Sequence, residues 1–140
     1  MTTIRPMTAA DYDQAAALWQ AAEGIGLDDV DSREHIAAYL ARNGPMSFAA
    51  IDDADGRIVG AVLCGTDGRR GYMHHLAVAP THAGQGLGRS LCQACLDALG
   101  RAGIRKCHIF VFARNVKARN FYAATGWKLR EDLMVMSKET

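Results

Sequence analysis

The sequence predicts an α/β (α+β) protein with a mixed central sheet, in which an antiparallel meander precedes a β-α-β crossover. Short apolar runs bounded by turn residues cluster between residues 47 and 78, as in a meander. A helical pattern over about 86–103 then separates the last of these runs from a further strand at 106–112. Such a crossover joins parallel strands, so we expect one parallel pair, formed by residues 72–78 and 106–112.

The composition is that of an ordinary globular protein, and we expect a single domain over residues 1–140. Apolar residues make up 49% of the 140 residues, charged residues make up 22%, and the net charge is +1. This balance argues against a general attraction to nucleic acid or to acidic membranes. No apolar run approaches a membrane span of about 20 residues, and residues 1–8 lack the apolar stretch of a signal peptide, so a cytoplasmic location is expected.

The first third of the chain predicts a short strand and two helices. The strand covers residues 4–6, and the first helix covers about 9–23, with one apolar face made by residues at helical spacing, namely Tyr12, Ala15, Ala16 and Trp19. An acidic connection follows. The second helix covers about 32–42 and ends before Asn43, Gly44 and Pro45, which do not favour its continuation.

The rest of the chain alternates strands and helices. The meander strands are residues 47–51, 57–64 and 72–78, and the helix over 86–103 buries Leu87, Leu91, Ala94, Cys95, Ala98 and Leu99. After the strand at 106–112 we expect a helix over 116–125, ended by Gly126, and a final extended segment over 127–136. The predicted order is β-α-α-β-β-β-α-β-α-β.

The four cysteines are expected to be buried apolar residues. Cys92 and Cys95 have a spacing found in redox and zinc sites, but they lie within a helical run. No second Cys or His pair supplies the remaining ligands of a zinc site, so no metal is expected.

A glycine-rich loop carries the most information about function. Gly84, Gln85, Gly86, Leu87, Gly88 and Arg89 follow the end of a predicted strand and begin a helix. Glycines let backbone N–H groups converge on a ligand, and a helix N-terminus adds free N–H groups and partial positive charge. The loop is therefore either a tight turn or a site for a pyrophosphate. Its spacing fits neither a dinucleotide fingerprint nor a nucleotide P-loop.

Two segments resemble motifs of the GNAT superfamily of N-acetyltransferases. Val78 and Pro80 followed by the glycine-rich loop at 84–89 resemble its acetyl-CoA-binding motif, with Ala83 where Gln or Arg is common. The segment 115–127 resembles a later motif of the family, with Trp127 where Phe is usual. Both motifs occur in the family's order, with a strand between them.

The resemblance implies a fold in which the parallel strands splay apart and acetyl-CoA, as co-substrate, lies between them. It implies that the backbone of Leu76, Ala77 and Val78 pairs with pantetheine, and that the loop binds the pyrophosphate through Gly84, Gln85, Gly86, Leu87, Gly88 and Arg89. Asn115 would contact the pantetheine arm or fix the helix that follows it.

The implied reaction is direct attack of a primary amine on the thioester in a ternary complex. Tyr122 stands where the family places the general acid that protonates the leaving sulfur; the alternative is a packed aromatic residue on an amphipathic helix. His74 is the candidate base, because it precedes Leu76 by two residues and shares its face on a regular strand. His75 is expected on the other face, in a structural role.

Alternatives to His74 remain open. His108, on the neighbouring strand, is a second candidate base, and a water relay is a third. Some protein-N-terminal acetyltransferases carry Glu at the position of Phe110, so that arrangement is absent here. Four carboxylates lie where the family forms the wall of the acceptor site, namely Glu23, Asp28, Asp29 and Asp31. They either attract a cationic amine or form a solvated loop.

The predicted function is therefore acetyl transfer from acetyl-CoA to a primary amine of a small molecule, protein or peptide, with no nucleic-acid or membrane partner. Two other functions remain open at this point. One is a non-catalytic acyl-CoA-binding or sensing module, and the other is a protein-interaction module. The final strand would offer an open sheet edge, through which a homodimer is possible.

Overall fold

The computed structural model describes residues 1–140, and its contacts divide the chain into two compact units, residues 1–110 and residues 111–140. Each unit is described by itself. The single domain expected from the sequence stays a prediction. No helix has both the length and the apolar character needed to cross a membrane.

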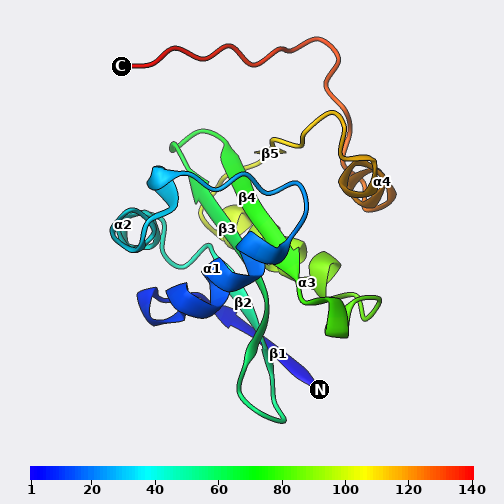
Figure 1. The fold of residues 1–140 in the computed structure, drawn as a ribbon. Helices are drawn as coiled ribbons and strands as arrows, with labels where there is room; N and C mark the ends of the chain where they lie inside the picture. Colours follow the sequence, from blue (N-terminus) through cyan, green and yellow to red (C-terminus); the bar gives the residue numbers. More distant parts are fainter. The chain divides into compact units, whose positions relative to one another are not determined.

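The first unit is built on a five-stranded mixed sheet in the order β1-β2-β3-β4-β5 (Figure 1). The strands are β1 (Thr2–Pro6), β2 (Phe48–Asp52), β3 (Ile58–Thr66), β4 (Gly71–Val78) and β5 (Cys107–Ile109). The first four strands pair antiparallel, while β4 and β5 pair parallel. The predicted meander and parallel crossover pair are therefore confirmed.

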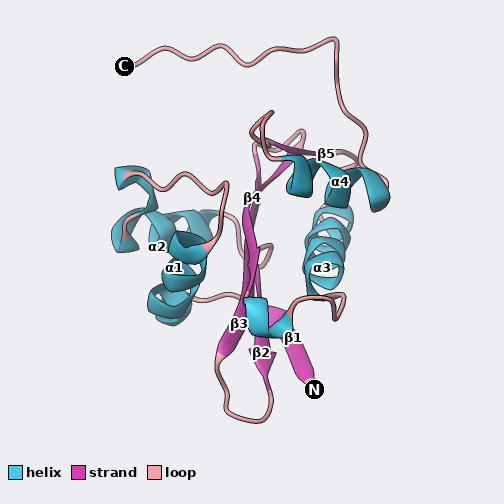
Figure 2. Cartoon of the chain, turned by 45° about the vertical axis from the view of Figure 1, so that its right-hand side comes forward, coloured by secondary structure: helices cyan, strands magenta, loops and turns pink.

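Helices cover both faces of this sheet. Two helices, α1 (Tyr12–Ala21) and α2 (Arg33–Arg42), lie on one face, and α3 (Leu87–Arg101) lies on the other (Figure 2). Three short 3₁₀ helices precede them in turn: η1 (Ala9–Asp11), η2 (Asp29–Asp31) and η3 (Pro80–His82). Ser32 caps α2 by accepting a hydrogen bond from the His35 N–H at 3.3 Å, which satisfies one free donor of the first turn.

The core occupies both sides of the sheet. On the side of α1 and α2, Trp19 and Ile36 pack with Leu63 and Ala77, all of them buried. On the side of α3, the buried face of the helix comprises Leu87, Leu91, Cys92, Cys95, Ala98 and Leu99. The thiols of Cys64, Cys92 and Cys95 are buried, that of Cys107 is half-buried, and all four are free.

The second unit contains one helix, α4 (Val116–Ala124). Asn115 caps it by accepting a hydrogen bond from the Ala118 N–H at 3.1 Å, as its place just before the helical pattern indicates. Gly126 has φ +98° and follows the helix, so the predicted helix end is confirmed. The Trp127 N–H donates to the Tyr122 carbonyl and closes this end at 2.9 Å.

Two strand predictions need correction. Residues 127–136 form no strand, although the apolar residues Leu133–Met136 favour one; a strand needs a neighbour for its N–H and C=O groups, and these residues pair with none. The strand expected at 106–112 is also shorter, because β5 ends at Ile109. The predicted element order holds from the first strand through α4.

Candidate active site

A β-bulge interrupts β4 in its middle. Ala61 pairs with Ala77 and Leu63 pairs with His74, so one residue of β3 lies opposite two residues of β4, His75 and Leu76. His75 has φ +58°, a left-handed conformation that costs a residue other than glycine about 1–3 kcal/mol. Such bulges re-aim side chains next to functional sites.

The bulge changes which side chains share a face. His74 and His75 both line the pocket on the side of α2, and Ala77 packs in the core on that same side of the sheet. Two successive residues on one face leave Leu76 on the other. The expectation that His75 faces away was therefore wrong, as was the expectation that His74 and Leu76 share a face. Both rested on unbroken alternation along the strand.

Beyond the bulge, β4 loses its parallel neighbour. The pairing of β4 with β5 ends at Met73 and Ile109, whereas β4 continues to Val78. The parallel pairing thus covers only the first part of β4, and the divergence expected of the two parallel strands stays a prediction. On the edge of β4 that faces β5, the backbone of Leu76, Ala77 and Val78 has no β5 partner. A sheet edge of this kind accepts extended ligands that carry amide groups.

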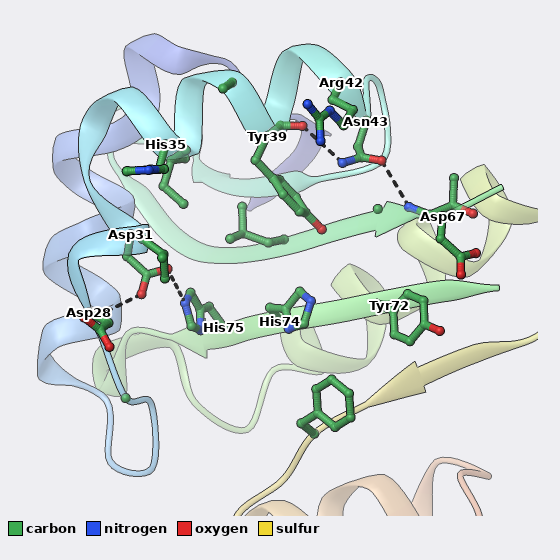
Figure 3. Close-up of a pocket in the computed structure, with 18 residues that line it drawn as sticks. Asp28, Asp31, His35, Tyr39, Arg42, Asn43, Asp67, Tyr72, His74 and His75 are labelled. Atoms are coloured by element: carbon green, nitrogen blue, oxygen red, sulfur yellow. Dashed lines mark hydrogen bonds and ion pairs between the residues drawn. The ribbon is translucent and has the colours of Figure 1, made fainter. Parts of the chain in front are cut away.

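A pocket of about 980 Å³ lies between α2, the connection before it and β4. Figure 3 shows Tyr72, His74 and His75 in a row along β4, with Tyr39 reaching toward them from α2. Carboxylates stand at both ends of this row: Asp28 and Asp31 near His75, and Asp67 near Tyr72 (Figure 3). Of the four carboxylates expected at an acceptor wall, Asp28 and Asp31 line the pocket, and Glu23 and Asp29 do not.

His74 lies in the middle of the row. Its ring centroid is 6.4 Å from that of His75 and 6.2 Å from that of Phe110, and its nitrogens make no hydrogen bond within the protein. Burial lowers the pKa of His74, and the neighbouring His75 lowers it further. The imidazole is therefore neutral at pH 7, with a nitrogen available to accept a proton.

His75 is held by Asp31. Its Nε2 lies 2.8 Å from Asp31 Oδ1, and its ring lies 5.4 Å from that of Trp19 in α1. Asp31 also accepts a hydrogen bond from the Asp28 N–H at Oδ2 and from the Tyr12 hydroxyl at its carbonyl. Asp31 thus organises the connection before α2 and joins it to the bulge.

Tyr39 forms part of the opposite wall. Its hydroxyl is buried without a hydrogen-bond partner, and burial raises the pKa of the phenol above its usual value. A side chain at Gly65 would begin 2.7 Å from this oxygen and 2.6 Å from Asn43, so only glycine fits there. Asn43 fixes the end of β3 by accepting a hydrogen bond from the Thr66 N–H at 3.1 Å.

The glycine-rich loop lies between η3 and α3 and leaves its amides free. Gly84 and Gly86 both have φ +79°, which favours glycine, and both are exposed. None of the N–H groups of residues 84–89 donates a hydrogen bond within the protein. With the N-terminus of the 15-residue helix α3 beside them, these groups can bind an anion such as a diphosphate.

The other predicted residues lie elsewhere. The His108 ring lies tilted at 41° against that of Tyr72, with centroids 5.8 Å apart, and His108 is absent from the pocket lining. Tyr122 and Asn115 belong to the second unit, where the half-buried Tyr122 ring meets the Trp127 ring edge-on at 5.6 Å. Sequence reasoning missed Tyr72 and Asp67, which come from separate segments and form no local motif.

Fold and site together define an α/β protein that has a strand–loop–helix with free N–H groups after β4 and a side-chain pocket beside β4. The chain belongs to the acetyltransferase (GNAT) family, whose model matches residues 12–127. The match to the family thus spans every helix and strand from α1 through α4.

Similar proteins agree with this assignment. The chain is 31% identical over 100 residues to N-alpha-acetyltransferase 30 of Schizosaccharomyces pombe, a match that covers 67% of this chain and 65% of the yeast protein. The chain therefore spans just under two thirds of that relative. The PaiA N-acetyltransferase of Thermoplasma acidophilum, solved with coenzyme A, superposes with TM-score 0.82 at 16% identity, over 94% of this chain and 92% of that one.

A third similar protein is the ribosomal-protein-S18-alanine N-acetyltransferase of Escherichia coli. It superposes with TM-score 0.71 at 23% identity, over 90% of this chain and 77% of that one. At these identities the two solved structures establish the fold, and the family match establishes the acetyltransferase class.

Proposed function

We propose that this protein transfers an acetyl group from acetyl-CoA to a primary amine by direct attack in a ternary complex. The observation that carries the proposal is the row of unpartnered N–H groups at residues 84–89, next to the unpaired stretch of β4. The free N–H groups can bind the diphosphate of the coenzyme, and the unpaired backbone of β4 can pair with the amides of its pantetheine arm.

On the donor side, Leu76, Ala77 and Val78 bind pantetheine, and residues 84–89 bind the diphosphate. Gly84 and Gly86 let the chain approach the phosphates closely, because neither carries a side chain. Asn115, which caps α4, contacts the pantetheine arm or fixes the helix that carries Tyr122. The support for both Asn115 and Tyr122 is their position in the motif over residues 115–127.

On the acceptor side, the amine binds in the pocket beside His74. The amine nitrogen attacks the thioester carbonyl carbon, the carbon–sulfur bond breaks, and His74 takes the proton that the nitrogen loses. The backbone N–H near Leu76 stabilises the developing oxyanion, to which one such donor contributes about 3 kcal/mol. Tyr122 donates a proton to the departing thiolate. A general acid or base typically contributes about 10²–10⁴-fold.

The ends of the pocket favour a cationic acceptor. The Asp29 side chain, together with the Asp29 N–H, lowers the pKa of Asp28, and the N–H groups of Arg70 and Arg69 lower that of Asp67. Both carboxylates therefore stay ionised at neutral pH. They attract an ammonium group from solution, and the amine becomes nucleophilic once it has lost its proton.

The test is an acetyl-CoA turnover screen with free thiol as the readout. The acceptors are amino acids, polyamines, aminoglycosides and peptide N-termini, since one similar protein is an N-alpha-acetyltransferase and another is a ribosomal-protein-S18-alanine N-acetyltransferase. We expect thiol release that depends on one class of amine, together with mass-spectrometric detection of the acetylated product. Tight binding of acetyl-CoA with no turnover on any class would instead identify a sensing module.

A further inference from the structure

A second histidine–carboxylate pair lies outside the pocket, beside the segment that leads into the glycine-rich loop. His82 Nε2 is 2.8 Å from Asp52 Oδ2, and the two side chains are 19% and 20% exposed. His82 ends η3, two residues before Gly84, whereas Asp52 ends β2, 30 residues earlier in the chain. The other ring nitrogen, Nδ1, lies 2.8 Å from the Thr81 hydroxyl, so both ring nitrogens have partners.

Asp52 is itself held in place. Its Oδ1 accepts a hydrogen bond from the Ala54 N–H at 2.9 Å, and its own N–H donates to the Arg57 carbonyl at 2.8 Å. The carboxylate therefore projects from a fixed hairpin at the end of β2. The contact with His82 joins this hairpin to the segment that leads into the glycine-rich loop.

Few other bonds fix that segment. Ala79 is tied to the sheet by the bond from its N–H to the Val59 carbonyl, and η3 then closes on itself through Ala83 and Pro80. No backbone hydrogen bond follows until Ser90 donates to Gly86. The His82 side chain is thus the last hydrogen-bonded or ionic link to the sheet before the free amides of the loop begin.

We propose that His82 and Asp52 are positioning residues for the acyl-CoA donor, which hold the start of the glycine-rich loop in its binding conformation. The proposal rests on the proposed function, because the ligand of the loop is taken to be acetyl-CoA. A loop that is already ordered binds its ligand with a smaller entropic cost, so losing the link weakens donor affinity and leaves the acceptor pocket unchanged.

The experiment is titration calorimetry with acetyl-CoA on the full chain. We expect His82→Ala and Asp52→Ala each to raise the dissociation constant by about fivefold to twentyfold, because only part of the free energy of a hydrogen bond to a charged group serves to order the loop. The double variant is expected to be no weaker than either single variant, because both remove one contact. Asp55→Ala, in the turn after β2, is the matched control and is expected to bind like the wild type.

A conservative variant and steady-state kinetics separate positioning from general stability. His82→Gln retains an N–H that reaches Asp52, so we expect its affinity to stay within about twofold of wild type. For the alanine variants the KM for acetyl-CoA is expected to rise, with kcat and the KM for the amine unchanged. Exchange of the hydrogen-bonded N–H groups of His82 and Ala83, which donate to the Ala79 and Pro80 carbonyls, is expected to quicken in the same variants, and in Asp52→Asn if the alanine variants do not fold.

Two results would overturn the positioning role. One is wild-type affinity for acetyl-CoA in the folded His82→Ala and Asp52→Ala variants. The other is unchanged exchange of the His82 and Ala83 N–H groups in Asp52→Asn when the alanine variants do not fold. A wild-type protein that does not bind acetyl-CoA at all would overturn the proposed function itself, and would do so before any variant is made.

Discussion

The glycine-rich loop and the side-chain pocket are built in opposite ways. The loop is one continuous segment, residues 84–89, and it presents backbone N–H groups. The pocket takes its side chains from η2, α2, β3 and β4, and it depends on a bulge to turn His75 inward. A site made of backbone N–H groups requires particular residues, such as glycine, within one short segment, so it can be recognised in the sequence. A site made of side chains from distant segments has no such local pattern, and its residues can differ from one ligand to another.

The largest effect is expected at the centre of the pocket. His74→Gln should lower kcat by about 10²–10³-fold, because it removes the proposed base, while the affinity for acetyl-CoA stays unchanged. Stopped-flow or steady-state thiol release measures the rate, and calorimetry measures donor binding. His35→Gln, at another pocket histidine, serves as the control and should retain most of the activity. Equal losses in the two variants would contradict the role of His74.

The reverse experiment breaks the loop and spares the pocket. Gly86→Val places a β-branched residue at φ +79° and a side chain among the free amides, so acetyl-CoA affinity should fall about tenfold to a hundredfold. The KM for the amine should not change. Gly100→Val, at an exposed position of α3 with open space around it, is the control for valine in a helix. Undiminished affinity in Gly86→Val would remove the loop from the donor site.

A smaller effect is expected where the acceptor side is anchored to the sheet. Asp31→Ala removes the partner of His75 and loosens the connection before α2, so the KM for the amine should rise about fivefold to tenfold. Asp29→Ala changes an exposed neighbour in the same short helix and should have little effect. If both variants raise this KM equally, the loss reflects the charge of the loop and not the anchoring contact.

The smallest effect concerns pH. Burial holds the pKa of His74 below the ordinary histidine value of 6.5, and the neutral imidazole is the form that accepts a proton. At saturating donor, turnover should therefore not vary with the protonation of His74 near pH 7 and should decline only as the pH falls below 6.5 through the lowered pKa. A pH–rate profile tests this, and His74→Gln should lose that acidic limb. An unchanged limb in the variant would assign it to another group.

The same comparison explains what could be predicted from the sequence. The meander, the crossover and the buried face of α3 follow local periodicity, which the structure retains. The position of His75 does not follow local periodicity, because a bulge arises from how β3 and β4 pair and leaves no pattern in the sequence of β4 itself. The missing final strand has a similar cause, since the apolar run Leu133–Met136 indicates strand propensity but not a partner.

The pocket residues beyond the two histidines illustrate a further limit. Tyr39 and Gly65 are 26 positions apart, yet one requires the other, because only a glycine leaves space for the phenol oxygen. Neither residue is informative alone. A tyrosine at helical spacing indicates a core position, and a glycine within a strand indicates only a less stable strand. Their relation becomes visible only when α2 lies against β3.

The buried cysteines have a practical consequence for every rate measurement above. A disulfide reagent that reports released CoA reacts with thiolates. Burial raises the pKa of Cys92 to about 12, and the pKa values of Cys64 and Cys107 are raised as well. The folded protein should therefore react little with the reagent. An increase in the signal of a variant without substrates would then reveal unfolding in the same assay that measures the rate.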